Sequence, residues 1–290
     1  MKYEGIIIRP PSEADSILLQ VTVGCSHNRC TFCPTYKGVP FRIKSDDEIL
    51  EDIEDASSCR WSRRLFLCDG DALIIPQKRL RFLLQCIGRR LPWIERVGTY
   101  GNAKSILRKS VEELKELKHL GLGIVYLGLE SGNEDILKRI EKGATTVQMI
   151  NAAQRIREAG IKLSVTVLLG IGGSIMSGDH ARDTAKVLTL MNPEYIGALT
   201  VMIAPHTPLQ EAARSGKFVL PGIFKMLEEL RIMIDESSFS ACLFTSNHAS
   251  NYLPVRAKLP EERAATLKYL STVIAAGDGT LLRPEYFRGL

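Results

Sequence analysis

The sequence lacks long apolar segments and runs of like charge. Of its 290 residues, 45% are hydrophobic and 24% are charged, yet no stretch reaches the roughly 18 uninterrupted apolar residues that a membrane-spanning helix needs. Residues 1–15 contain only a short apolar stretch before Pro10 and Pro11, which is unlike a signal peptide. We therefore expect a soluble, cytoplasmic protein that can bury a sizeable core.

The chain also lacks a disulfide framework and a concentrated basic patch. Its seven cysteines are odd in number and irregularly spaced, which suits a reducing cytosol. The formal charge of +5 is spread along the chain, so it gives little support for an anionic partner. Neither nucleic acid nor a membrane is indicated as a partner.

Three cysteines do stand close together, in the segment LLQVTVGCSHNRCTFCPTYK of residues 18–37. The apolar residues 18–23 predict a strand, and the polar loop after it carries Cys25, Cys30 and Cys33. Thiolates select zinc, copper(I) or iron–sulfur clusters over hard cations. A closed zinc site usually needs four protein ligands, and no second Cys-x-x-Cys pair follows. The loop favours an iron–sulfur cluster, with zinc as the alternative.

Apolar strands and amphipathic helices alternate along the rest of the chain. The expected strands are 18–23, 64–68, 94–100, 124–129, 162–169 and 195–203. A first helix is expected to begin at Ser45. Further helices are expected at 76–90, 110–120, 133–159 with a break at Gly143, 179–191 and 220–235. This α/β pattern predicts parallel strands joined by right-handed crossovers. Six such units can form an open sheet or a partial barrel. A further strand at 241–244 and a helix at 261–275 depart from the repeat.

Polar residues and glycines recur where the predicted strands end. In both kinds of parallel sheet, the chemistry gathers at the carboxyl ends of the strands. The residues at or just after these ends are Cys25, Asp69, Tyr100, Glu130, Gly170 and His206. Their common position predicts one functional edge of the sheet.

The cysteine loop resembles the signature of the radical S-adenosylmethionine (SAM) superfamily, Cys-x3-Cys-x-aromatic-Cys. Phe32 supplies the aromatic residue before Cys33, whereas the gap between Cys25 and Cys30 is one residue longer than in the usual pattern. A flexible loop can absorb one extra residue at little cost in closure entropy. The similarity is strongest to the branch that includes anaerobic coproporphyrinogen oxidases, elongator-type enzymes and methylthiotransferases.

This resemblance implies a fold and a domain division. The family fold is a partial (β/α)6 barrel, which agrees with the six strand–helix units. We expect an N-terminal lead-in at residues 1–17, a core barrel at 18–238 and a C-terminal extension at 239–290 that closes one end of the barrel.

The resemblance also implies two cofactors, a [4Fe–4S] cluster ligated by the three cysteines and SAM bound to its open iron. The turn at 69–71 matches the family position that receives the SAM amino group, and Lys142 matches the residue that pairs with the SAM carboxylate. Glu130 matches the position for the ribose or the methionine part, and Gly170 with Thr166 matches the region that flanks adenine. The full set assigned to SAM is Phe32, Asp69, Gly70, Asp71, Tyr100, Asn102, Glu130, Ser131, Lys142, Thr166, Gly170 and His206.

The implied activity is reductive cleavage of SAM to a 5′-deoxyadenosyl radical, which abstracts hydrogen from an unidentified substrate. An electron donor such as flavodoxin or ferredoxin would supply the electron. A second cysteine set for an auxiliary cluster is missing, which counts against methylthiotransferase chemistry.

Three other functions stay open. They are a zinc-stabilised binding module, an iron–sulfur electron carrier, and an enzyme that breaks a different sulfonium C–S bond, which the longer cysteine gap allows. The polar run at residues 246–254 has two interpretations. It lines the barrel mouth together with His206, or its side chains hold an irregular loop together by bonds to the backbone.

Overall fold

The computed structural model describes residues 1–289, which fall into two compact units. The first unit comprises Met1–Asn28, Thr35–Leu127 and Asn151–Leu163, and the second comprises Arg29–Pro34, Gly128–Ile150 and the chain from Ser164 onward. Both units are drawn from several separate segments of the chain. The domain division expected at residues 17 and 238 stays a prediction.

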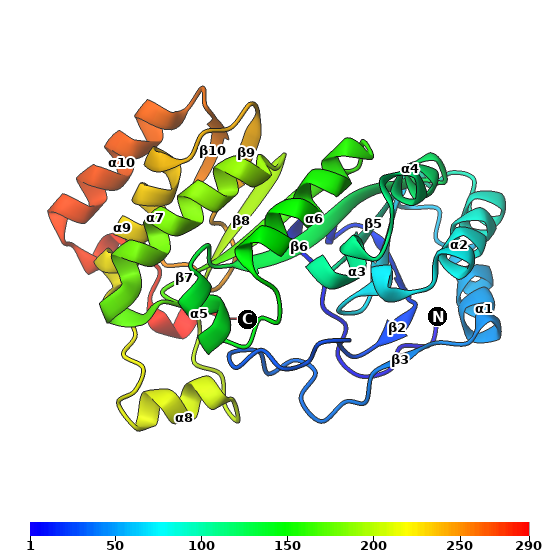
Figure 1. Cartoon of the computed structure of the whole chain (residues 1–290), viewed down its shortest axis with the longest axis horizontal. Coiled ribbons are helices and arrows are strands. Elements are labelled where there is room, and N and C mark those ends of the chain that lie inside the picture. The colour runs from blue at the N-terminus through cyan, green and yellow to red at the C-terminus, as the bar shows by residue number, and fades with distance from the viewer. Residues whose placement is uncertain (290) are drawn as a thin grey trace. The chain divides into compact units, whose positions relative to one another are not determined.

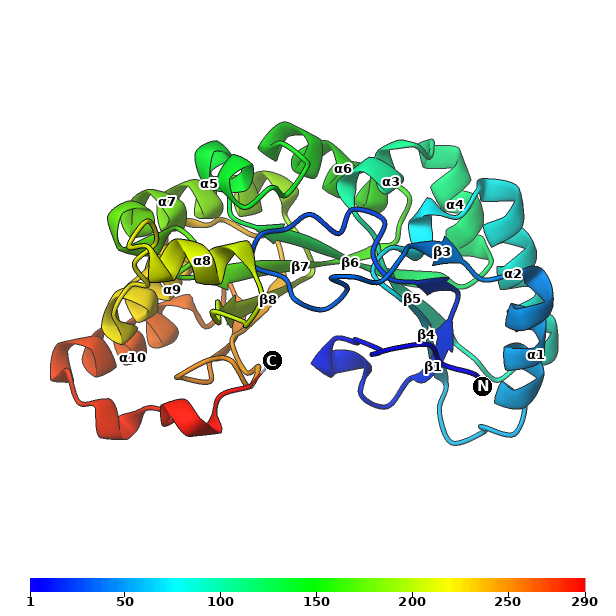
Figure 2. The same ribbon diagram turned by 90° about the horizontal axis from the view of Figure 1, so that it is seen from below.

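The first unit is built on parallel strands in the order β1-β4-β5-β6; Figure 1 labels β5 and β6, and Figure 2 labels all four. Helices α1, α2 and α4 pack side by side along one face of these strands (Figure 2). A separate antiparallel pair, β2 with β3, leads into the cysteine loop. The elements are η1 (Pro11–Glu13), β1 (Ile17–Gln20), β2 (Thr22–Val23), β3 (Arg42–Ile43), α1 (Asp46–Ala56), β4 (Arg64–Cys68), η2 (Ala72–Ile74), α2 (Gln77–Arg90), β5 (Arg96–Tyr100), α3 (Ala103–Leu107), α4 (Val111–His119) and β6 (Leu122–Glu130), whose last three residues belong to the second unit.

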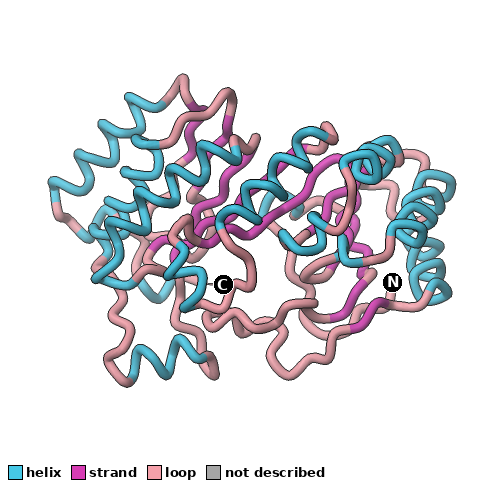
Figure 3. Tube along the Cα trace, in the orientation of Figure 1, coloured by secondary structure: helices cyan, strands magenta, loops and turns pink. Residues whose placement is uncertain are grey.

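The second unit carries strands in the order β7-β8-β9-β10, of which only β10 runs antiparallel to its neighbour. Helix α9 packs between α7 and α10, and Figure 3 shows the three as neighbouring helices. The elements are α5 (Glu134–Arg139), α6 (Thr146–Glu158), β7 (Lys162–Leu169), α7 (Gly173–Met191), β8 (Tyr195–Thr200), α8 (Pro208–Arg214), α9 (Ile223–Glu236), β9 (Cys242–Thr245), β10 (Arg256–Leu259), α10 (Arg263–Ala276), η3 (Gly279–Leu281) and η4 (Glu285–Phe287). The end of α6 and the start of β7 belong to the first unit.

The alternation of strands and helices expected from the sequence is confirmed. The Ser45 side chain caps α1, and Ser110 with Glu113 forms the expected capping box at α4. Helix α2 buries Leu80, Leu83, Leu84, Cys86 and Ile87, the spacing of one helical face. The break at Gly143 separates α5 from α6, as expected.

Several boundaries differ from the expectation. The expected strand at 18–23 is divided into β1 and β2. Helix α7 begins at Gly173 rather than at residue 179. This start was not predicted, because the two glycines at 172 and 173 are typical of a loop. Strand β8 ends at Thr200 rather than at residue 203. The short elements β3, α3, α8 and β10 were not predicted, since so few residues carry little periodicity.

Within residues 1–289, no helix is both long enough and apolar enough to span a membrane.

A buried ion pair joins β3 to α1. Lys44 directly follows β3, and its Nζ donates to Asp52 Oδ2 at 2.7 Å and to the Lys2 carbonyl oxygen at 2.9 Å. Both charged side chains of the pair are buried. A buried carboxylate depends on its cation, because it has left the water that would otherwise solvate it.

We expect Lys44→Met to lower the free energy of unfolding by about 3–5 kcal/mol, because Asp52 then keeps a buried charge without its cation. Urea denaturation measures this loss. The double variant Lys44→Met/Asp52→Leu is the matched control and should regain most of the stability. A single variant as stable as the wild type would contradict this role.

Candidate functional site

Cys25 lies in the loop after β2 and is held close to Gly70, which follows β4. A Cβ atom added to Gly70 would lie 3.0 Å from the Cβ and 3.3 Å from the Sγ of Cys25. Both distances are tight for carbon and sulfur atoms. Glycine at position 70 therefore lets the turn after β4 lie directly against the first cysteine.

Asp71 organises the side chains next to this cysteine. Its Oδ2 accepts hydrogen bonds from Ser26 Oγ at 2.8 Å, Asn102 Nδ2 at 2.6 Å and Ser105 Oγ at 2.5 Å. Asn102 also caps α3. Burial raises the pKa of Asp71 to about 6, although these donors favour the carboxylate. The residue after Cys25 is thus tied to the ends of β4 and β5.

Asp69 is the second buried carboxylate of this turn. It accepts hydrogen bonds from Gln20 Nε2 at 2.8 Å and from the Tyr36 hydroxyl at 3.2 Å. Burial raises its pKa above the ordinary range. A carboxylate offers about four lone-pair sites, so these two bonds leave acceptor capacity for an ammonium group.

The second half of the cysteine loop is anchored in the second unit. The Thr31 N–H donates to the Ile140 carbonyl oxygen, and the Leu209 N–H donates to the Thr31 carbonyl oxygen, both at 3.0 Å. Phe32 packs against an apolar cluster of Ile136, Leu137, Ile140, Leu168, Ile171, Val201, Leu209 and Phe218. The aromatic residue therefore fixes the loop between its last two cysteines by packing.

Cys25, Cys30 and Cys33 form no disulfide bonds, and all three are half-buried. Three soft sulfur donors within nine residues of chain fit the ligand set of a [4Fe–4S] cluster. Within residues 1–289, no group of three or more His, Cys, Asp or Glu side chains is drawn together tightly enough for a single metal ion.

Glu130 and Lys142 form an ion pair with each other. Lys142 Nζ lies 2.7 Å from Glu130 Oε1, and both side chains are largely buried. Glu130 has a left-handed backbone, with φ of 66°. A Cβ on Gly128 would lie 2.3 Å from Glu130 Oε1, so the pair covers this glycine. The sequence predicted separate contacts with SAM for these two residues and missed their pairing.

Helix α7 holds the turn that follows Glu130. His180 Nδ1 lies 2.8 Å from Ser131 Oγ, and the Gly132 N–H donates to Thr184 Oγ1 at 2.9 Å. A Cβ on Gly132 would lie 2.3 Å from the Asp183 carbonyl oxygen, so only glycine allows the helix to approach this closely. Ser131, one of the residues assigned to SAM, is buried and bonded to the protein itself.

Gly170, the turn residue after β7, contacts α9. Its N–H donates to Glu229 Oε2 at 2.6 Å, and a Cβ would lie 2.8 Å from Met226 Sδ. Its φ of 82° also favours glycine. The expected contact of Gly170 with adenine stays a prediction.

Two buried titratable residues of this region were missed by sequence reasoning. Burial raises the pKa of Glu229 to about 7 and lowers the pKa of His180 to about 4. Glu229 Oε1 also accepts from Ser177 Oγ at 2.6 Å. A signal for Glu229 existed, because it stands within the buried face of α9 between Met226, Leu227 and Leu230. His180 had no comparable signal.

The other expected residues are placed as follows. Tyr100 packs edge-on against Phe66, with ring centroids 5.1 Å apart, and burial raises its pKa far above the ordinary value. Thr166 is half-buried on β7. His206 was expected at the end of a strand, but it lies in an exposed turn before α8, because β8 ends six residues earlier.

The polar run at 246–254 holds its own loop together. Asn251 Nδ2 donates to the Ala198 carbonyl oxygen at 2.9 Å, and Asn251 Oδ1 accepts from Thr200 Oγ1 at 2.9 Å. Ser246 Oγ bonds to the backbone of Leu253 and of Val255. These contacts support the second interpretation, in which the side chains of the run hold an irregular loop together by bonds to the backbone.

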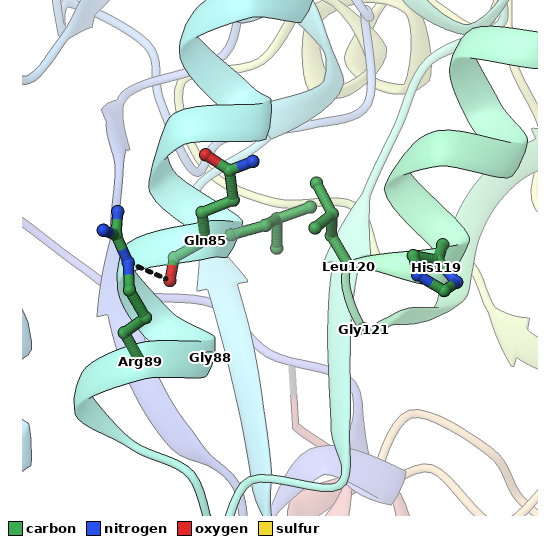
Figure 4. Close-up of a pocket in the computed structure, with 7 residues that line it drawn as sticks. Gln85, Gly88, Arg89, His119, Leu120 and Gly121 are labelled. Atoms are coloured by element: carbon green, nitrogen blue, oxygen red, sulfur yellow. Dashed lines mark hydrogen bonds between the residues drawn. The ribbon is translucent and has the colours of Figure 1, made fainter.

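A surface hollow of about 620 Å³ lies in the first unit, near the ends of α2 and α4 (Figure 4). It is lined by Leu84, Gln85, Gly88, Arg89, His119, Leu120 and Gly121. None of the expected site residues belongs to this lining.

The sequence of this chain matches the family model of the radical SAM superfamily over residues 19–186, which is more than half of the chain. The chain belongs to the radical SAM superfamily. The match contains all three loop cysteines and every expected site residue except His206. It confirms the resemblance predicted from the cysteine motif.

Two known relatives of this radical SAM chain each share about a quarter of their aligned residues with it. A 4′-phospho-dehydrooxetanocin synthase from Priestia megaterium is 24% identical over 261 residues, covering 76% of this chain and 33% of that protein. The heme chaperone HemW from Lactococcus lactis is 24% identical over 216 residues, covering 73% of this chain and 55% of that protein. The chain thus spans between a third and about half of the length of these two relatives.

Among solved structures, methylornithine synthase (PylB) matches with a TM-score of 0.55 and 15% identity, covering 77% of this chain and 63% of that chain. This likeness confirms the α/β fold class of a radical SAM barrel. Members of this superfamily use a [4Fe–4S] cluster and SAM, and the use of both by this chain is part of the proposal below. The residues that bind them stay predictions.

Glu229 and His180 should give the folded protein opposite pH dependences. The raised pKa of Glu229 means that stability falls as the pH rises from about 4.5 to about 7, whereas the lowered pKa of His180 means that stability rises from about pH 4 to about 6.5. Glu229→Gln removes only the first effect. We therefore expect the variant to gain stability relative to the wild type, by about 1–3 kcal/mol, as the pH rises from 5 to 7.

Urea denaturation at several pH values measures this difference. Glu236→Gln at the exposed end of α9 is the control and should follow the wild type. If the free energy of unfolding changed equally with pH in the wild type and in Glu229→Gln, a protonated Glu229 in the folded state would be contradicted.

Proposed function

We propose that this enzyme cleaves SAM reductively to a 5′-deoxyadenosyl radical, which abstracts hydrogen from an unidentified substrate. Cys25, Cys30 and Cys33 are the proposed ligands of the [4Fe–4S] cluster. When bound, the reduced cluster supplies the electron that breaks the sulfonium bond of SAM. The observation that carries this proposal is the set of three half-buried cysteines, none of them in a disulfide bond, inside the matched family segment.

The protein residues in this proposal bind and orient SAM. Asp69 keeps acceptor sites for the SAM ammonium group beside its two internal hydrogen bonds. Glu130 and Lys142 already form a pair, so we propose that they act as one unit, in which Lys142 meets the SAM carboxylate and Glu130 accepts from the ribose hydroxyls. Burial of these charges strengthens their interaction with a bound ligand.

An external reductant belongs to the same proposal. We propose a low-potential electron carrier such as a flavodoxin or a ferredoxin, and a reducing cytoplasm as the location, since the cysteines form no disulfide bonds. The substrate is not assigned.

The test is anaerobic purification, reconstitution with iron and sulfide, and reaction with dithionite and SAM. We expect about four irons per chain and 5′-deoxyadenosine as a product detected by chromatography. The variant in which Ala replaces Cys25, Cys30 and Cys33 should lose both the iron and the nucleoside. Full iron and SAM cleavage in that variant would overturn the ligand assignment.

The products also separate the alternatives. Zinc in place of iron, without a nucleoside, would identify a structural zinc site. A cluster that does not react with SAM would identify an electron carrier. A SAM fragment other than 5′-deoxyadenosine would identify cleavage of a different sulfonium C–S bond.

Gly70→Ala should lower the iron content after reconstitution, because the added methyl group meets the Cβ and Sγ of Cys25. We expect a loss of at least about threefold, since displaced ligand geometry typically costs 10–100-fold in metal affinity. Gly88→Ala on α2 is the matched control, because nothing lies within 4 Å of its added Cβ. Equal iron contents in the two variants would show that the contact with Gly70 does not position Cys25.

A further inference from the structure

His180 is a fully buried histidine on α7 that the proposed SAM site does not include. Its Nε2 lies 3.0 Å from the Leu168 carbonyl oxygen, and its Nδ1 lies 2.8 Å from Ser131 Oγ. Leu168 stands near the end of β7, and Ser131 directly follows β6. One imidazole ring therefore bonds to the ends of two strands of the sheet.

The hydrogen-bond partners fix the form of this ring. The Leu168 carbonyl oxygen can only accept, so Nε2 carries the proton and donates. Nδ1 then accepts from the Ser131 hydroxyl, which itself accepts from the Asn133 N–H at 3.1 Å. The ring is neutral, in agreement with its lowered pKa. Each nitrogen thus has one defined role.

Two further side chains fasten the same turns. Thr184, one helical turn after His180, accepts from the Gly132 N–H at 2.9 Å. Glu229 on α9 accepts from the Gly170 N–H at 2.6 Å, and its Oε2 lies 3.8 Å from His180 Nε2. The turn after β6 and the turn after β7 are therefore each held by a helix side chain, and His180 touches both.

We propose that His180 is a positioning residue for SAM binding. By bonding Ser131 and Leu168 at once, it fixes the turn at residues 130–132 relative to the turn at residues 169–171. This inference rests on the proposed function, in which Glu130 and Gly170 contact SAM. It assigns no contact with SAM to His180 itself.

A role in packing alone leads to a different expectation. Removing His180 leaves the Leu168 carbonyl oxygen and the Ser131 hydroxyl without this partner, which costs stability. The loss would then appear only in stability. Positioning predicts a loss of SAM affinity in a folded protein, because the loss of a side chain that orients binding groups typically costs about 10–100-fold.

The test compares His180→Leu, which loses both hydrogen bonds, with His180→Gln, whose amide can donate to Leu168 and accept from Ser131. Leu188→Ala is the control, because Leu188 is buried on the same helix and its loss lowers stability without touching either turn. The dissociation constant for SAM is measured by equilibrium dialysis of the reconstituted proteins. Hydrogen exchange of residues 128–133 and 166–172 is measured on the proteins as purified.

We expect His180→Leu to raise the dissociation constant at least about tenfold and to speed amide exchange in both turns. His180→Gln should stay within about threefold of the wild type, and Leu188→Ala should keep the wild-type SAM affinity. A folded His180→Leu protein with wild-type affinity, or a Leu188→Ala protein with an equal loss, would overturn the inference.

Thr184→Val covers the case in which His180→Leu does not fold. This near-isosteric change keeps the imidazole but removes the bond to Gly132 and the 3.4 Å contact of Thr184 Oγ1 with His180 Nδ1. It should weaken SAM binding in the same direction, and unchanged affinity would overturn the role of the α7 contacts. The two proposals fail differently. A wild-type protein that binds no SAM overturns both, whereas wild-type binding that His180→Leu leaves intact overturns only the positioning role.

Discussion

Buried polar groups at the carboxyl ends of the strands must find hydrogen-bond partners, since each unpaired group costs about 1–3 kcal/mol. In the first unit this requirement is met at Asp69 and Asp71, which together accept bonds from Gln20, Tyr36, Ser26, Asn102 and Ser105. In the second unit it is met at Ser131 and Glu229. The turns that bear the candidate site are therefore held by the protein before any ligand arrives.

Glycines make these contacts sterically feasible. Gly70 admits Cys25, Gly132 admits α7, and Gly170 admits Met226, each at a distance that a Cβ would obstruct. The cysteine loop is anchored differently, by backbone bonds of Thr31 and by the apolar packing of Phe32. The three cysteines are half-buried and form no disulfide bonds. Pre-organised ligands lose less conformational entropy when a cofactor binds.

Much of the fold followed from local signals. The capping residues Ser45 and Ser110 and the strand–helix alternation depend on neighbours within a few positions, so they can be read from the sequence. Strand β10 and helix α8 were missed because they are short, and the start of α7 was missed because its glycines are typical of loops. At the site, Glu130 ends a strand as expected, and Lys142 follows twelve residues later. Their mutual ion pair was not foreseen.

The sequence by itself determined the donor chemistry, namely three thiols in nine residues and an aromatic residue before the last, together with the α/β alternation. Only the tertiary structure decided which polar groups are already engaged. The decisive bonds join Ser26 to Asp71, Ser131 to His180 and Gly170 to Glu229, which are 45, 49 and 59 residues apart along the chain. Pairings at such separations leave no local periodicity, because they arise when the parallel crossovers bring strand ends and helices together.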